Sequence, residues 1–170
     1  MKKILIVFIS LVVLSASCSQ EPSQECKALE TAKSNLENNI KLYATVWEEV
    51  FKNRDISLVN TDSFDSEVSV LTSAGKISGI DAFRDYYNNY LTGFSDPEFK
   101  IIDVFGQGDR IVKHWNFKGT HDGVFFGIPA TNNKVDLYGT TLVTMKDGKV
   151  FQEEDFFDNH TFLTQLGLIE

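Results

Sequence analysis

Apolar residues recur at helical spacing in two stretches of the chain. In residues 26–54 they follow three- and four-residue steps, at Leu29, Leu36, Ile40, Tyr43, Trp47 and Val50. In residues 79–91 the same spacing joins Ile80, Phe83, Tyr87 and Leu91. This spacing places apolar side chains on one side of an amphipathic helix. The pattern therefore predicts two helices, each with one buried stripe.

Most of the remaining chain alternates between apolar and polar residues, which is typical of strands. The predicted strands cover residues 67–73, 76–78, 98–106, 110–120, 134–145 and 149–157. Glycine-containing turns separate several of them, and tight turns join antiparallel neighbours. Helices grouped before such a meander predict an α+β domain in which a curved antiparallel sheet wraps around the N-terminal helices. Residues 158–168 predict a short last helix, with Asp158 or Asn159 as its N-cap.

The segment between two of these strands, "GVFFGIPATNNK" at residues 123–134, is unusually apolar for a connection. An exposed loop has no use for Phe125, Phe126 and Ile128 together. These side chains are therefore expected either to close over the core of the domain or to form the wall of a pocket.

The N-terminus has the layout of a secretory signal. Lys2 and Lys3 precede an apolar run, and small residues then precede Cys18, which resembles a bacterial lipobox. The run is shorter than the roughly 20 apolar residues that span a bilayer. We expect a signal peptide at 1–17, a lipidated tether at 18–27 with the lipid on Cys18, and one domain at 28–170. The protein would be exported and membrane-anchored, facing the periplasm or the cell exterior, with a secreted soluble form as the alternative.

The composition narrows the range of partners. The formal net charge is -8, and it becomes more negative once Lys2 and Lys3 are removed. Such a domain repels phosphate backbones, so nucleic acid is not an expected partner. No basic cluster favours lipid headgroups, which leaves the N-terminal lipid as the membrane contact. Cys26 is then without a partner for a disulfide, the alternative being a Cys18–Cys26 bridge.

Sequence motifs for metal, phosphate or serine-hydrolase chemistry are not found. The histidines are widely spaced, which argues against a zinc or iron site. The "GQGDR" segment lies in a hairpin turn and does not open a helix, unlike a phosphate-binding loop. No G-x-S-x-G sequence is present, so a nucleophile elbow is not expected.

Several short motifs occur in a familiar order. They are Gly119-Thr120-His121, the loop at 127–132, the hairpin at 147–150, Asp158, and Gln165-Leu166-Gly167. From about residue 52 to residue 169 this arrangement resembles the SnoaL-like polyketide cyclases, or ester cyclases, of the nuclear transport factor 2-like superfamily. Glu154 stands where the family commonly has tryptophan, and residues 67–73 carry no histidine.

The resemblance implies a cone-shaped pocket between curved sheet and helices, no cofactor, an aspartate as acid and base, and a possible homodimer. The apolar loop would form the rim and wall of the pocket, with Pro129 stiffening it. Asn132 and Asn133 would replace glycine where the backbone needs a positive φ, which asparagine tolerates.

Asp158 is the expected acid–base residue, because a carboxyl group in a dry pocket can have a raised pKa. Its alternative role is a helix N-cap, which would keep the pKa low. Glu154 and Phe156 share its strand face and are expected beside it, although Glu154 could instead be solvated or paired with a lysine. Glu153 and Asp155 are expected on the outer face.

His121, before the loop, could orient or protonate a substrate oxygen, although loop histidines more often lie at the surface. The expected ligand-binding residues are Phe125, Phe126, Ile128, Trp115, Tyr138, Phe156 and His114. Two functions remain open. The first is an enzyme that acts on a small hydrophobic carbonyl compound, and the second is a lipoprotein that binds such a molecule without transforming it.

Overall fold

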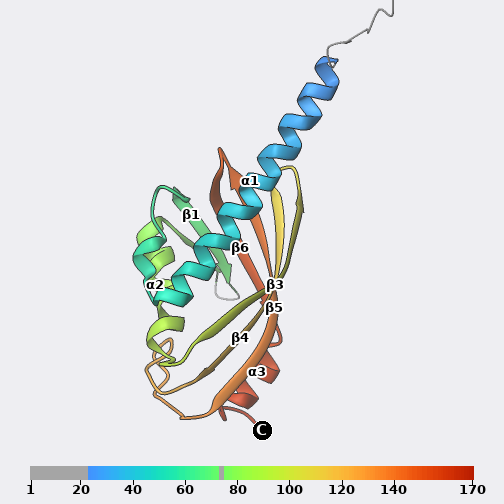
Figure 1. The fold of residues 1–170 in the computed structure, drawn as a ribbon. Helices are drawn as coiled ribbons and strands as arrows, with labels where there is room; N and C mark the ends of the chain where they lie inside the picture. The colour runs from blue at the N-terminus through green and yellow to red at the C-terminus, as the bar shows by residue number, and fades with distance from the viewer. Residues whose placement is uncertain (1–22, 73–74) are drawn as a thin grey trace, which may run out of the picture.

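The structure is a computed structural model that describes residues 23–72 and 75–170. The predicted signal peptide and the predicted lipidation at Cys18 lie outside the described residues. The elements, in chain order, are α1 (Gln24–Asn53), η1 (Ile56–Leu58), β1 (Phe64–Thr72), β2 (Gly75–Ser78), α2 (Ile80–Thr92), β3 (Glu98–Gln107), β4 (Arg110–Thr120), β5 (Lys134–Lys146), β6 (Lys149–Phe157) and α3 (Asn159–Gln165). The predicted α+β architecture is confirmed (Figure 1).

The strands form one six-stranded sheet in the order β2-β1-β6-β5-β4-β3. Every neighbouring pair is antiparallel except β1 and β6, which are parallel. The sheet is thus mixed, and the prediction of a wholly antiparallel sheet is wrong at this pair. Tight turns fix the direction of consecutive strands only, whereas β1 and β6 come from opposite ends of the domain and meet through the fold.

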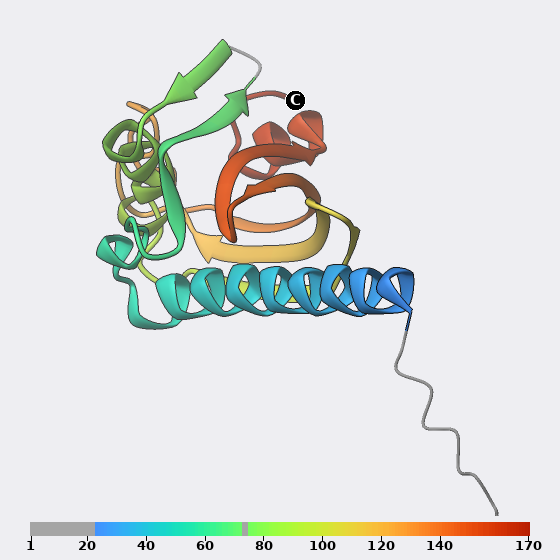
Figure 2. The same ribbon diagram turned by 90° about the horizontal axis from the view of Figure 1, so that it is seen from above.

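The sheet curls around a core that the helices close. Viewed from above, α1 runs beside β3 and α2 lies near β1 and β2 (Figure 2). The predicted stripes are buried in part: α1 buries Tyr43, Trp47 and Val50, together with Asn39 and Phe51, and α2 buries Phe83, Tyr87 and Leu91. Leu29 is 65% exposed, so its predicted place in the buried stripe is wrong. The first turns of α1 are exposed and project beyond the sheet (Figure 1). None of the described helices is long and apolar enough to cross a membrane.

The two faces of the sheet are clearest on β4. Ile111, Lys113, Trp115 and Phe117 are all buried on the face toward the helices, which we call the concave face. His114 and Lys118 alternate with them and lie on the outer face. The alternation follows from the two-residue period of a strand.

A β-bulge interrupts this alternation in β6. Met145 of β5 pairs with Val150, but the preceding Thr144 pairs with Gln152, so Phe151 is an additional residue. Val150 and Glu153 are consequently both buried, although their numbers differ by three. A bulge of this kind reverses the assignment of odd and even residues to the two faces.

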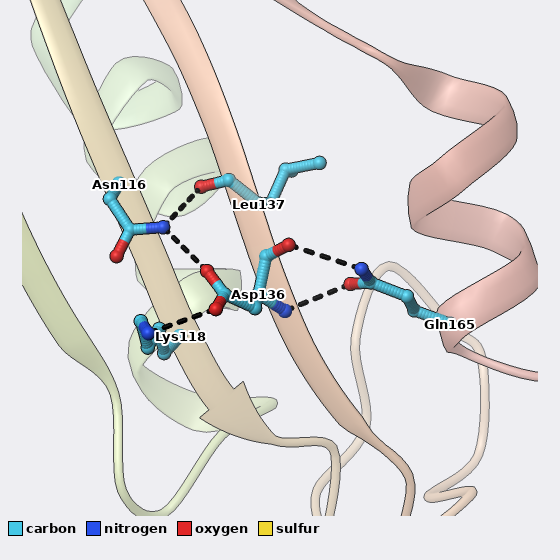
Figure 3. A network of polar contacts seen from close by, with 5 residues as sticks. All are labelled: Asn116, Lys118, Asp136, Leu137 and Gln165. Atoms are coloured by element: carbon cyan, nitrogen blue, oxygen red, sulfur yellow. Dashed lines mark hydrogen bonds and ion pairs between the residues drawn. The ribbon is translucent and has the colours of Figure 1, made fainter.

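The last helix is fixed by Gln165 to the edge of β5 that β6 leaves unpaired. Its Oε1 accepts from the Asp136 backbone N–H at 2.8 Å, and its Nε2 donates to the Asp136 carbonyl at 3.1 Å (Figure 3). The Asp136 side chain accepts from Asn116 at 2.7 Å and pairs with Lys118 at 2.8 Å. The glutamine of the "QLG" segment thus has a structural role in this protein.

Candidate functional site

An inner cavity of about 40 Å³ lies between the concave face and the helices. Such a volume holds a few water molecules or one small polar group. Its lining is mostly aromatic and comes from α1, α2 and three strands: Trp47, Phe51, Tyr87, Tyr90, Phe99, Lys113, Trp115, Phe117, Asp155 and Phe157. Lys113 and Asp155 are the only ionic side chains of this lining.

Two carboxyl groups of β6 meet in this region. Glu153 is completely buried, and its Oε1 accepts from the indole N–H of Trp47 at 2.8 Å. Asp155 accepts from the Thr141 hydroxyl at 2.5 Å, and Trp115 donates to that same hydroxyl at 2.9 Å. Hydrogen bonds therefore hold both carboxyl groups at fixed positions.

The Tyr87 hydroxyl joins the two carboxyl groups. It lies 3.0 Å from Glu153 Oε2 and 2.8 Å from Asp155 Oδ2. A phenol has one proton to donate, so both contacts are hydrogen bonds only when one carboxyl group is itself protonated. Burial raises the pKa of Glu153 to about 7, Lys113 opposes this rise, and Asp155 adds to it. A proton on Glu153, donated to Tyr87 while Tyr87 donates to Asp155, satisfies all three groups.

Lys113 lies opposite these groups on β4, with a side chain only 3% exposed. Its Nζ is 4.9 Å from the ring centres of Tyr43 and Trp47 and 5.1 Å from that of Phe99. Burial lowers the pKa of Lys113, whereas Glu153 and Asp155 act in the opposite direction. These aromatic faces and carboxyl groups are the surroundings that stabilise a buried cation.

A larger hollow of about 490 Å³, which we call the vestibule, adjoins the inner cavity. Tyr90, Asp155 and Phe157 line both spaces. The volume is in the range of small-molecule sites. The Asp155 carboxyl group therefore lies where a ligand in the vestibule would meet the dry interior.

The apolar loop takes both of its possible roles. Phe125 is buried and packs edge-on against Tyr90 and Phe162, so it closes the core. Phe126 and Ile128 are less buried and, with Phe125, line the vestibule. Phe126 has a φ of 45°, a left-handed conformation that is uncommon for an aromatic residue. Such strain is often found at functional sites.

His121 fixes the base of this loop and does not line either space. It is completely buried, and its carbonyl accepts from the backbone N–H groups of Thr131 and Asn132. Its Nδ1 lies 3.1 Å from the Thr131 hydroxyl. Asn132 has a φ of 59°, which confirms the predicted positive φ at this position. The position of His121 is thus that of a structural residue.

Asp158 is exposed and caps α3, as its alternative role predicted. Its carboxylate accepts from the Thr161 backbone N–H at 3.1 Å and from the Thr161 hydroxyl at 2.6 Å. These hydrogen bonds lower the pKa of Asp158. The carboxyl group that enters the dry interior belongs instead to Asp155, three residues earlier.

Replacing Asp158 with alanine is expected to lower the free energy of unfolding, because the first turn of α3 loses its cap. Urea denaturation monitored by circular dichroism measures this change. Serine at the same position can still cap the helix and should recover most of the loss. Equal losses for alanine and serine would contradict the capping role.

The expected faces of β6 are corrected by the structure. Glu153 and Asp155 lie inside rather than on the outer face. Glu154 is half-buried and Phe156 is exposed, and both line the vestibule. The prediction was wrong because it counted the two faces from Asp158, which lies beyond the end of β6 as the exposed N-cap of α3.

The structure also shows where three predicted pocket residues of β4 and β5 lie. Trp115 lines the inner cavity as expected. Tyr138 is 58% exposed and lies with His114 on the outer face, their ring centres 6.4 Å apart. The prediction that these two residues line the pocket is therefore wrong. Strand alternation separates the residues of the two sheet faces but does not show which face is concave.

Lys113 is not among the predicted site residues, although the alternation of residues along β4 contains a signal for it. Lys113 has the same parity as Ile111, Trp115 and Phe117, so a lysine occupies a position where the strand is otherwise apolar. A lysine on a buried face is rare unless it has a partner or a function. Among the described residues, no group of three or more His, Cys, Asp or Glu side chains could hold a metal ion.

Comparison with known proteins gives the same fold. The family model of the SnoaL-like polyketide cyclases matches residues 41–166. A protein from Jannaschia sp. CCS1 that is named for this family is 22% identical, with 79% of this chain and 94% of that chain covered and a TM-score of 0.71. TsrD from Streptomyces laurentii is 20% identical, with 77% and 96% covered and a TM-score of 0.69. TerC, co-crystallized with polyporic acid, is 19% identical, with 76% and 98% covered and a TM-score of 0.62. No curated protein matches the chain.

Proposed function

The chain belongs to the SnoaL-like polyketide cyclase family, and from this premise we propose that it performs acid–base chemistry on a small apolar carbonyl compound, using its own side chains. The observation that carries the proposal is the position of Asp155. Its carboxyl group lines both the vestibule and the inner cavity, and Tyr87 and Thr141 orient it.

Asp155 is the proposed base. A ketone held among the aromatic side chains of the vestibule would present an α-carbon to this carboxylate, which removes a proton and leaves an enolate. The enolate then attacks a second carbonyl carbon, or takes a proton back at another carbon, according to the substrate. The first outcome closes a ring and the second is an isomerisation.

Glu153 and Tyr87 form the proposed proton reserve. When Asp155 gains a proton from the substrate, both carboxyl groups are neutral, and the Tyr87 hydroxyl between them can still accept from one and donate to the other without moving a heavy atom. The Tyr87 hydroxyl thus links the two carboxyl groups through contacts of 3.0 and 2.8 Å. Such a pair can accept a proton and return it at nearly constant geometry.

Proton exchange tests this proposal without knowledge of the natural substrate. We suggest 2-tetralone, a two-ring enolisable ketone, incubated with the purified protein in deuterated buffer. Loss of the α-proton signal in ¹H NMR is expected to be at least about 10-fold faster than in buffer. Binding detected by line broadening, without faster exchange, would overturn the acid–base proposal. That result would favour the alternative, a protein that holds a hydrophobic ligand without transforming it.

A further inference from the structure

Lys113 is a buried donor that has no acceptor among the residues that the structure describes. Its ammonium group can donate three hydrogen bonds. Within residues 23–72 and 75–170, it makes no hydrogen bond and no ion pair within 4.0 Å. The buried carboxyl group of Glu153, by contrast, is hydrogen-bonded to both Trp47 and Tyr87. The Lys113 ammonium group therefore keeps its hydrogen-bonding capacity for an acceptor that the described residues do not supply.

The inner cavity is the place for that acceptor. Lys113 lines it together with Asp155, and its volume of about 40 Å³ is too small for a whole substrate. An oxygen atom with the carbon that carries it would fit. The rest of such a molecule would extend past Tyr90 and Phe157 into the vestibule, because these residues line both spaces.

The charged groups around the inner cavity favour the binding of a negatively charged oxygen atom. The groups facing Lys113 are Glu153 and Asp155 from β6, Tyr43 and Trp47 from α1, and Phe99 from β3. Once one proton is retained by the two carboxyl groups, a single negative charge balances the lysine. When Asp155 takes a proton from the substrate, that negative charge moves to the substrate oxygen, and Lys113 is the cation nearest to it.

We infer that Lys113 is a catalytic residue whose ammonium binds the enolate oxygen of the substrate, which makes the inner cavity an oxyanion subsite for enolisable ketones and 1,3-diketones. This inference rests on the proposed function, because it concerns the same substrate. The role resembles that of preorganised donors in other enzymes, which act where charge develops in the transition state. Asp155 and Lys113 then act on two different atoms of one carbonyl compound.

Binding of acetylacetone tests the subsite separately from catalysis. This 1,3-diketone forms an enolate with its own ultraviolet absorbance, so titration at neutral pH shows whether the protein binds the anion. The wild-type protein is expected to increase the enolate fraction. Lys113→Met removes the cation while keeping a similar length, and it is expected to weaken this binding by about 10- to 100-fold.

The controls separate the possible outcomes. Lys118→Met removes a lysine from the outer face of the same strand and is expected to leave the affinity unchanged. Asp155→Asn is expected to keep enolate binding even if proton exchange is lost, so failure of the subsite and failure of the proposed base are distinguishable. Unchanged affinity in a folded Lys113→Met protein would overturn the inference.

Two further experiments on the wild-type protein, mass spectrometry and crystallography, also test the subsite. A neutral Lys113 amine would attack a carbonyl carbon of acetylacetone and lose water, giving a covalent enaminone. Such an adduct on Lys113 would overturn the inference, since an ammonium cannot form it. A crystal structure with acetylacetone is expected to place one of its oxygens within hydrogen-bond distance of Lys113 Nζ, and an oxygen elsewhere would contradict the subsite.

Discussion

Replacing Asp155 with asparagine is expected to slow the exchange of 2-tetralone α-protons by about 10²- to 10⁴-fold, the usual contribution of a positioned acid or base. Asparagine keeps the shape of the side chain, and its oxygen can still accept from Thr141. It cannot accept a proton from carbon at neutral pH. Exchange rates from ¹H NMR, with circular dichroism to verify the fold, measure the effect.

Asp158→Asn is the matched control, because it makes the same chemical change three residues further along the chain. Asp158 is exposed and caps α3, so the exchange rate is expected to remain close to that of the wild type. The reverse pattern, a slow Asp158→Asn protein and a normal Asp155→Asn protein, would show that the base is the aspartate expected from the family resemblance. That pattern would exclude Asp155 as the base.

Replacing Glu153 with glutamine is expected to stabilise the protein at high pH and to have little effect at low pH. Burial raises the pKa of Glu153 from 4.5 to about 7, so the folded protein holds this proton more tightly than the unfolded chain does. Between these two values the free energy of unfolding of the wild type falls as pH rises. Over the whole pH range between these two pKa values, the free energy of unfolding falls by about 3 kcal/mol. Glutamine remains neutral over this pH range, so the Glu153→Gln protein does not lose this stability.

Urea denaturation of both proteins at pH 5 and pH 8 measures the difference. The Glu153→Gln protein should be close to the wild type at pH 5 and more stable at pH 8. Glu154→Gln is the control on the same strand, because Glu154 is only half-buried and should show no comparable gain. A glutamine variant at position 153 that is equally destabilised at both pH values would indicate a permanently ionised Glu153.

Much of the fold could be predicted because its signals are local. The stripe at Tyr43, Trp47 and Val50 was predicted from helical spacing, and all three residues are buried. β4 and β6 begin and end at their predicted residues, since a glycine turn precedes each strand and the N-cap Asp158 follows β6. The parallel pairing of β1 with β6 could not be predicted in this way. It depends on how distant segments meet, which no local pattern records.

The site was harder to predict, and β6 shows why. Alternation sorts its residues into two sets, but it does not show which set faces the pocket. The family resemblance placed Asp158 in the pocket, and counting back from Asp158 then placed Asp155 outside it, whereas Asp158 caps α3. The apolar loop was easier, because three large side chains in a connection require burial wherever the loop lies. Phe125 and Ile128 line the vestibule as predicted.

The bulge in β6 also bears on how such a protein could change its chemistry over time. Deleting one residue beside Phe151 would restore regular pairing and turn Glu154 and Phe156 inward in place of Glu153 and Asp155. The loss of a single codon could thus exchange the side chains that face the cavity without substituting any of residues 153–156. Insertions and deletions in this hairpin, more than point substitutions, are where divergence of activity among related chains should be sought.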